Sequence, residues 1–325
     1  ESLGYNLWSL SADYENCLHR CVRNDFVQGS RLLTTWDAPW VNGSPCCNQR
    51  DRFGDTPLHV AARLCGTHWM HLKYLLEAPG VDVRVPDCTR KTALHLLLLR
   101  IQTRWAAQRM MLGHEPLLND VRNQLEPTPT AVLTVVARIL ERGAQAGTSA
   151  FAMLTSPDSD GHTALEYAVG TGVSSLVFAL LRDHTVGIDK TDGVLTALLT
   201  KMLRQAVLLD QYDMTLTVGT HVLRATPPVE PTGLAAFLVL SIQQCRGQAL
   251  RALLAIPASA SGSSFSKAIN APCAQTGLVP LQAAVALASK KCFPIGNVCT
   301  VAAPALSALE DVLQGPALHE LLSTC

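Results

Sequence analysis

Residues 51–62 read Asp-Arg-Phe-Gly-Asp-Thr-Pro-Leu-His-Val-Ala-Ala, which is the clearest structural signal in this chain. Thr56 can cap a helix, because its hydroxyl oxygen accepts a hydrogen bond from an unpaired amide of the first turn. The proline that follows loses no useful donor at the first helical position. Leu58, Ala61 and Ala62 then share one face at helical spacing, and the small alanines let a neighbouring helix approach closely. The segment therefore predicts a turn followed by a short, closely packed helix.

A second helix is expected over residues 68–77, where apolar residues recur at helical spacing. This spacing places Trp69, Leu72, Leu75 and Leu76 in one stripe that faces the first helix. The Pro-Gly turn that follows ends the second helix. Together the two segments predict a helical hairpin.

The threonine of this motif recurs along the chain and serves as a phase marker. Thr92 lies 36 residues after Thr56 (92 − 56), Thr163 lies 71 after Thr92 (163 − 92), and Thr196 lies 33 after Thr163 (196 − 163). Short intervals near 33 residues are typical of a helical repeat. The long interval is either two periods or one repeat with an insertion. We favour the insertion, because residues 130–144 have the pattern of a second helix and its closing turn.

The Gly-x-Thr-Pro-Leu-His-x-Ala-Ala motif at this spacing resembles the ankyrin repeat. The resemblance implies an all-α, ankyrin-like solenoid of helix-turn-helix repeats with short hairpin loops and several long insertions. We expect one array over residues 1–325, with clear repeats at 50–202, a degenerate first repeat or cap at 1–49 and degenerate repeats at 203–325. The segments that break the repeat rhythm, and are expected as insertions, are 101–128, 205–231, 257–276 and 290–304.

The composition of these insertions differs. Residues 101–128 mix Trp105 with methionines and arginines and predict an extra amphipathic helix, and a helix is also expected within 208–226. Residues 257–264 are rich in Ser, Ala and Gly, which predicts a flexible loop. Such insertions either reach a partner or fold against their own array, and the sequence leaves both open.

The charge balance does not indicate nucleic acid or an anionic membrane as the main ligand, since 26 Lys and Arg face 26 Asp and Glu. Residues 50–110 are nonetheless rich in Arg and Lys and form either a basic patch or an ordinary solvated rim. Residues 233–256 come nearest to a membrane span, but five Gln and Arg residues interrupt them. We therefore expect a soluble protein with no membrane insertion.

The cysteines suggest a reducing compartment, because there are 11 of them, an odd number without the spacing of a disulfide framework. We expect a cytoplasmic protein, with the nucleus as the alternative. The first residue is Glu1 rather than Met, so we expect a longer or processed chain.

Catalytic and metal chemistry are weakly represented. A zinc site is suggested by a group of residues without a Cys-x-x-Cys pair: Cys46, Cys47, Cys65, His68 and His71. The chain has no Gly-x-Ser-x-Gly, Gly-x-Gly-x-x-Gly or phosphate-binding Gly-Lys-Ser/Thr loop. We therefore predict no enzyme, no cofactor and no metal.

Three histidines, His19, His59 and His95, each stand fourth in the repeat signature. In the ankyrin family this histidine bonds to the backbone of the neighbouring turn, so a structural role is expected for all three. The variable, surface-pointing positions of the family predict a partner-binding set: Arg52, Phe53, Asp55, Arg63, Leu64, Thr89, Lys91, Arg100, Asp160 and His162.

Within that set Phe53 and the arginines are the strongest candidates, because aromatic and guanidinium groups dominate interface energetics. The alternative for Phe53 is that it folds onto the adjacent hairpin. Trp36 and Trp40 either cap the open end of the stack or form a docking site there.

These features predict a non-enzymatic scaffold or adaptor that binds one or more proteins through a concave face of hairpins and inner helices, and through the insertions. Two alternatives remain at this point. The chain is a regulatory or targeting module of a larger enzyme or channel, or it is a structural subunit of a large assembly.

Overall fold

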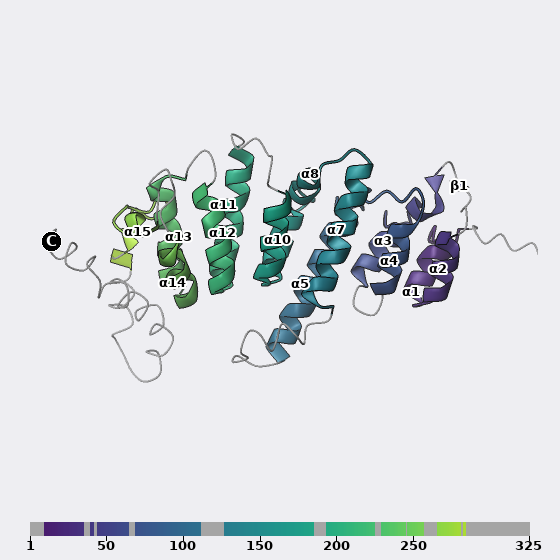
Figure 1. Ribbon diagram of the computed structural model, residues 1–325, viewed down its shortest axis with the longest axis horizontal. Helices are drawn as coiled ribbons and strands as arrows, with labels where there is room; N and C mark the ends of the chain where they lie inside the picture. Colours follow the sequence, from purple (N-terminus) through teal and green to yellow (C-terminus); the bar gives the residue numbers. More distant parts are fainter. Residues whose placement is uncertain are drawn as a thin grey trace, which may run out of the picture. The chain divides into compact units, whose positions relative to one another are not determined.

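The computed structural model describes residues 10–35, 40–41, 44–64, 69–111, 127–184, 193–224, 229–244, 246–256, 265–280 and 282–283 (Figure 1). Regular structure in these ranges is helical, apart from a two-stranded antiparallel hairpin that pairs β1 (Trp40–Val41) with β2 (Ser44–Pro45). The expected all-α class is confirmed for this part of the chain. None of the helices built from these residues combines the length and apolarity needed to span a bilayer.

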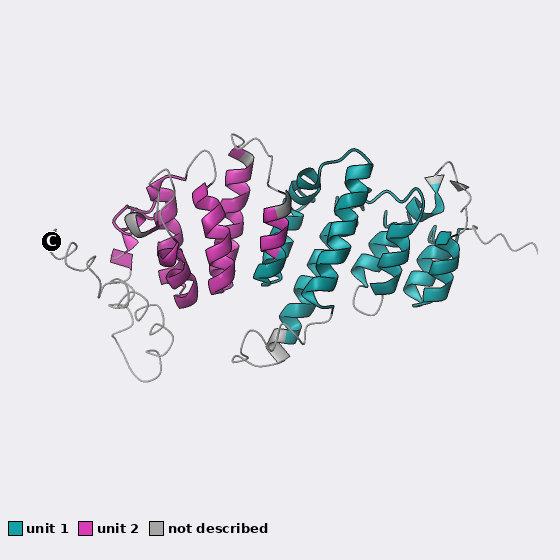
Figure 2. Cartoon of the chain, in the orientation of Figure 1, with its two compact units in different colours: residues 1–176 teal, residues 177–325 magenta. Residues whose placement is uncertain are grey.

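The chain divides into two compact units, Glu1–Leu176 (unit 1) and Val177–Cys325 (unit 2), shown in different colours in Figure 2. Helix α10 (Ser174–His184) spans the division. A continuous array through both units remains a prediction.

Unit 1 consists of two rows of helices. The first-helix row contains helices that each pack against the next along the chain: α1 (Cys17–Arg23), α3 (Pro57–Arg63), α5 (Ala93–Met111) and α9 (Ala164–Gly170). The second-helix row is ordered in the same way: α2 (Val27–Thr35), α4 (Trp69–Glu77) and α7 (Pro129–Gln145). Contacts of α1 with α2 and of α3 with α4 join the rows. This is the packing of stacked helical hairpins, in which each pair covers the apolar side of the next.

Two short helices complete unit 1. The 3-10 helix η1 (Cys46–Asn48) packs against α3, and α8 (Ala150–Thr155) packs against α7 and α9. Trp36 and the side chain of Trp40 lie outside the described residues, so their capping role remains a prediction.

The predicted core faces of α3 and α4 are largely as expected. Leu58, Ala61 and Ala62 are at most 1% exposed, and the three leucines of α4 are buried as well. Trp69 is the exception, because it is only partly buried. It begins α4 at a groove beside α7, rather than in the core stripe.

Helix α5 differs from the expected pattern. Residues 101–111, expected within an insertion, form its second half, because Ile101 and Trp105 continue the buried stripe of the first half and are fully buried themselves. Helix α5 also extends beyond its neighbours in Figure 1. Since α5 packs directly on α9, the two are neighbours in the first-helix row, and the described residues between Thr92 and Thr163 form no first helix other than α5. Residues 112–126 lie outside the described residues.

Besides the larger part of α10, the described residues of unit 2 form five helices: α11 (Gly193–Leu208), α12 (Tyr212–Arg224), α13 (Pro231–Gln243), α14 (Gly247–Ala255) and α15 (Phe265–Ala268). Helix α11 packs against α12 and α13, while α14 packs against α12 and α13. Residues 205–224, expected within an insertion, complete α11 and form α12, which packs against α11 and α14. Val218 and Val222 of α12 are fully buried. Residues 257–264 and 290–304 lie outside the described residues.

Candidate functional site

The hairpin turns of unit 1 are held by carboxylates at one repeated position. Asp51, Asp87 and Asp158 each stand five residues before a helix-capping threonine and are at most 6% exposed. In each, Oδ1 accepts hydrogen bonds from the amides two and four residues later, at 2.8 to 2.9 Å. In the turn before α1 Ser11 Oγ takes this role, accepting from Asp13 N at 3.2 Å and Glu15 N at 3.1 Å. The turn before α1 is therefore held in the same way without a carboxylate at this position.

The tip of each turn has a left-handed backbone. This residue stands two before the cap of α1, α3, α5 and α9, with φ of 60° at Tyr14, 79° at Gly54, 59° at Arg90 and 77° at Gly161. Glycine adopts this conformation at no steric cost, whereas other residues are strained there. Tyr14 and Arg90 therefore place large, exposed side chains at their tips at the cost of a strained backbone conformation.

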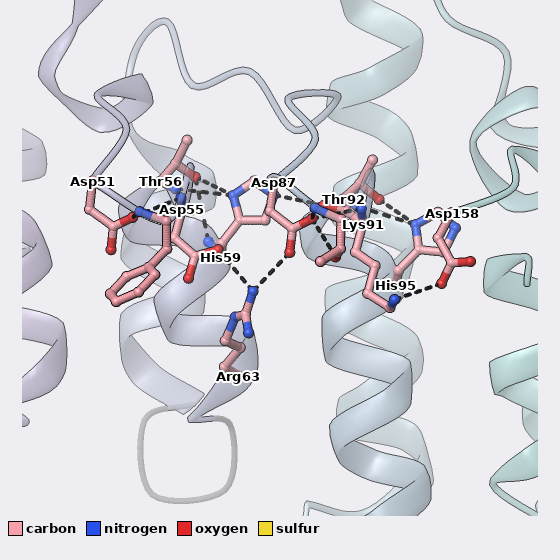
Figure 3. Close-up of polar contacts among 12 residues, drawn as sticks. Asp51, Asp55, Thr56, His59, Arg63, Asp87, Lys91, Thr92, His95 and Asp158 are labelled. Carbon is pink, nitrogen blue, oxygen red and sulfur yellow. Dashed lines mark hydrogen bonds and ion pairs between the residues drawn. The ribbon is translucent and has the colours of Figure 1, made fainter. Parts of the chain in front are cut away.

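The signature histidines connect each repeat to the next (Figure 3). The amide of Thr56 donates to Nδ1 of His59 at 3.2 Å, so Nδ1 is unprotonated and Nε2 carries the hydrogen that it donates to the Lys91 carbonyl, 3.2 Å away. His19 bonds in the same way to Asn16 N and Asp55 O. The structural role predicted for this histidine is confirmed.

His95 repeats the pattern, bonding Thr92 N and the Ser156 carbonyl. Burial lowers the pKa of His59 to about 4, and it lowers the pKa of His19 and His95 as well. These imidazoles are neutral at pH 7 and fully engaged, which leaves them no role as general bases.

Cations connect successive turns. Arg63 Nη2 binds Asp55 Oδ1 at 3.0 Å and Asp87 Oδ2 at 2.8 Å, so it lies between two hairpins in Figure 3. Arg23 makes the equivalent contact with Asp51 Oδ2 at 3.1 Å. Both arginines stand seven residues after their helix cap, a spacing that sequence reasoning could have used to pair them with the turn carboxylates.

The next repeat has Leu99 at this position and uses a different cation. Lys91 Nζ binds Asp158 Oδ2 at 3.1 Å and Asp160 Oδ2 at 2.8 Å. The Tyr167 hydroxyl donates to the same Asp158 oxygen at 2.7 Å, and together these bonds hold the pKa of Asp158 at about 2, against the opposing effect of burial.

The predicted partner-binding residues differ in their accessibility. Asp55 is only 4% exposed, and its carboxylate is occupied by Arg63. Leu64, Thr89 and Lys91 are partly buried. The remaining members of the predicted set are exposed: Arg52, Phe53, Arg63, Arg100, Asp160 and His162.

Phe53 and Arg52 form an exposed pair at one hairpin tip. The Arg52 guanidinium lies 4.6 Å from the centre of the Phe53 ring and binds Asp13 Oδ1 at 2.7 Å. Phe53 remains 49% exposed, and Tyr14 at the preceding tip is 59% exposed. Sequence reasoning missed Tyr14, although its position two residues before the Asn16 cap was a signal. The hairpin face is defined here as the exposed tip residues Tyr14, Arg52, Phe53, Arg90, Asp160 and His162.

A Ser-His-Asp arrangement occurs between α2 and α4. Ser30 Oγ lies 2.7 Å from His71 Nδ1, and His71 Nε2 lies 3.2 Å from Asp25 Oδ1. Ser30 and His71 are completely buried, so no substrate can reach the hydroxyl. The contacts tie α2 to α4 rather than form a nucleophile.

The suggested zinc ligands do not gather in the described part of the chain. Cys65 and His68 lie outside it, and His71 is bonded as above. Burial raises the pKa of Cys46 to about 12 and that of Cys47 to about 11, which opposes the thiolate form that zinc requires. Among the described residues, no group of three or more His, Cys, Asp or Glu side chains could hold a metal ion.

Comparison with known proteins supports the repeat unit directly. The family model described as Ankyrin repeat matches residues 53–88, from the tip at Phe53 through α3 and α4 to the next tip. A comparison with curated proteins finds no match. The chain therefore carries an ankyrin repeat at residues 53–88, as its Thr-Pro-Leu-His segment predicts.

Proposed function

We propose that this chain is a non-enzymatic interaction module that recruits another protein through the hairpin face of unit 1. The observation that carries the proposal is the exposure of two aromatic side chains on successive tips, 59% for Tyr14 and 49% for Phe53. Exposed aromatic and guanidinium groups are the usual anchors of protein interfaces. The ankyrin repeat is itself a protein-binding module, which supports the same reading.

The polar residues beneath the tips have a different task. Asp55, Arg63, Asp87 and Lys91 are engaged with one another or with the next turn. A rigid base of this kind reduces the entropy lost when the tips are ordered by a partner. We therefore assign these residues to holding the face, and assign the contact itself to the tips.

The face carries both signs of charge. Arg52 and Arg90 are exposed beside the aromatic tips, and Asp160 lies farther along the same row, with its side chain 64% exposed. We expect a partner that presents an apolar group to the aromatic tips and an acidic group to the arginines. Such a mixed pattern sets orientation as well as affinity.

The test is the double change Arg52→Glu with Phe53→Ala in the full protein. Partners are first identified by affinity purification with wild type, and their affinity is then measured for each variant. We expect at least a tenfold loss. Unchanged partner affinity in a folded variant would show that the hairpin face is not the contact surface.

A matched control exists in unit 2. Arg182 lies 5.9 Å from the centre of the exposed Phe178 ring, so Arg182→Glu with Phe178→Ala alters a similar pair elsewhere. This control should keep the wild-type affinity.

The stoichiometry of the purified partners separates the proposed adaptor from a subunit built into an assembly. Substoichiometric, exchangeable partners support the adaptor, whereas a fixed ratio that resists exchange contradicts it. Mass spectrometry of the intact complexes measures this ratio.

A further inference from the structure

A groove runs across the second-helix row of unit 1, away from the hairpin tips. It has two chambers that share Lys73 and Glu77 of α4. The chamber between α4 and α7 has a volume of about 800 Å³, and the chamber between α2 and α4 has a volume of about 580 Å³. Volumes of this size accommodate several side chains of a bound segment.

The chamber between α4 and α7, called here the apolar chamber, is lined largely by apolar side chains. Trp69, Met70 and Leu76 line it from α4, and Val135 lines it from α7 beside two alanines. Met70 is 41% exposed, and Trp69 is only partly buried. Apolar side chains that gather at a hollow, rather than lying singly, indicate a binding surface.

The chamber between α2 and α4, called here the cationic chamber, has different chemistry. Arg31 of α2 and Lys73 of α4 are exposed there and form no ion pair with any described residue. The hydroxyls of Thr34 and Thr35 donate to backbone carbonyls of α2. The donors that remain for a ligand are therefore Arg31, Lys73 and the Tyr74 hydroxyl.

The charges at the rim favour an anionic group in the cationic chamber. At the far edge of the apolar chamber Arg138 Nη1 binds Glu141 Oε2 at 2.7 Å, so these two charges offset each other. Arg31 and Lys73 then face one carboxylate, Glu77, which lies at the boundary of the two chambers. The net positive charge at one end complements a carboxylate beside an apolar segment.

We propose that this groove binds an acidic amphipathic helix of a partner protein. Its apolar side chains enter the apolar chamber, and an Asp or Glu about one turn away binds Arg31 and Lys73. The groove lies between helices that pack side by side, α2 with α4 and α4 with α7, and such a surface accepts a further helix by the ridge-into-groove packing that joins helices elsewhere. This site is independent of the hairpin face, so the protein has two binding surfaces.

The test begins with a yeast-displayed library of random 14-residue peptides, sorted for binding to the full wild-type chain. From the peptides that bind wild type, those that also bind the variant Ala137→Arg are removed, so that only peptides that require the open chamber are kept. Ala137 is exposed and lines the apolar chamber, and arginine keeps a high helix propensity while filling the space. We expect the remaining peptides to combine apolar residues at helical spacing with Asp or Glu.

The selected peptides are synthesised with a fluorescent label, and their affinities are measured by anisotropy. The reversal Arg31→Glu with Lys73→Glu should weaken binding at least tenfold. Three controls should leave affinity within about twofold: Ala144→Arg, at an exposed alanine of the same helix outside the groove; Arg90→Glu with Arg100→Glu; and Phe53→Ala on the hairpin face.

Four results would overturn the proposal: no peptide survives the depletion, the survivors are enriched in Lys or Arg, their affinity is unchanged by the reversal at Arg31 and Lys73, or the groove binds a second copy of the chain. In the last case wild type would sediment as a dimer and Ala137→Arg as a monomer. The variants at Ala137, Arg31 and Lys73 test the groove alone, and none of these residues belongs to the hairpin face. If the groove proposal fails, the proposed function of the hairpin face is therefore unaffected.

Discussion

The turns that precede the first helices of unit 1 and the turn at residues 273–278 of unit 2 both place a left-handed residue two positions before the cap, but different bonds hold them. In unit 1 a buried carboxylate accepts two backbone amides within each signature turn. The turn of unit 2 reads Cys-Ala-Gln-Thr-Gly-Leu and has no carboxylate. There the Cys273 amide donates to Leu278 O at 2.9 Å, and Gly277 has a φ of 68°.

The cap that follows differs as well. Val279 stands where unit 1 has threonine, and its amide donates to the side-chain oxygen of Gln282 at 3.1 Å, where unit 1 has the signature histidine. The buried carboxylates of unit 1 form strong hydrogen bonds with the turn amides. Their contribution to stability depends on their ionisation and on the presence of every bonding partner. The backbone bond between Cys273 and Leu278 and the glycine at 277 depend on neither. The comparison teaches that the signature turns of unit 1 depend on protonation and on single polar groups, whereas the described turn at residues 273–278 is closed by a backbone bond.

Acid should produce the largest effect. His59 has a pKa of about 4 in the folded protein and 6.5 as the ordinary value, so the unfolded chain binds the proton more tightly. The contribution of His59 to the free energy of unfolding is therefore fully present above about pH 6.5. It falls by roughly 3 kcal/mol as the pH is lowered toward 4. Urea denaturation at pH 7 and 4.5 measures the loss, and His59→Gln should reduce it.

The exposed His162→Gln is the matched control and should keep the wild-type pH dependence. Hydrogen exchange should show that the lost protection lies in unit 1. An equal loss in unit 2, or a wild-type pH profile in His59→Gln, would contradict the role given to this histidine.

Removal of one turn carboxylate should have the next largest effect. Asp87→Ala leaves the Thr89 and Lys91 amides without their acceptor and separates Arg63 from its second carboxylate. We expect the free energy of unfolding to fall by about 2 to 3 kcal/mol, measured by urea denaturation. Asp160→Ala removes an exposed carboxylate from a neighbouring tip and should cost less than about 1 kcal/mol. Similar losses in the two variants would mean that the buried turn bonds contribute little.

The two turn glycines provide a direct comparison of the units. At Gly54 a methyl group would lie 3.0 Å from the Cys88 backbone nitrogen, and φ is 79°. At Gly277 φ is 68°, and no heavy atom beyond the glycine and its two chain neighbours lies within 4 Å of the added group. Gly54→Ala should therefore cost about 2 kcal/mol, and Gly277→Ala about 1 kcal/mol, since only the first adds a steric clash to the strain. Thermal denaturation of both variants would show whether this order is reversed.

The smallest effect on stability is expected at the hairpin face. Arg52 and Asp13 form an ion pair with side chains 55% and 48% exposed, so solvent screens most of its energy. Arg52→Ala should change the free energy of unfolding by less than about 0.5 kcal/mol, while weakening partner binding. A loss above about 1.5 kcal/mol in urea denaturation would assign Arg52 to the fold rather than to recognition.

Much of unit 1 could be predicted from local signals. Thr56 as a cap, the proline after it and the role of His59 depend on residues within one turn or on a repeated position, and the structure confirms them. The end of α5 and the pairing of α12 with α11 could not be predicted in the same way. They depend on which apolar residues find a neighbour, and Trp105 is buried only because α5 continues past its first half.

Less of the candidate site could be predicted. Asp55 and Phe53 are close in sequence at one hairpin, yet one is buried beneath Arg63 and the other is exposed. The groove across α2, α4 and α7 gave a weaker sequence signal still, since Trp69 reads as one more core residue at helical spacing. Such distinctions require the positions of residues from neighbouring repeats.

The sequence by itself determined the helical class, the capped first helices and the ankyrin repeat at 53–88, because these depend on short spacings that repeat along the chain. Only the tertiary structure decided that Arg63 joins two turns, that Tyr14 and Phe53 remain exposed and that Arg31 and Lys73 share one chamber. The physical reason is range. A cap is completed within about one helical turn, whereas each of these features depends on the way helices from different repeats pack together.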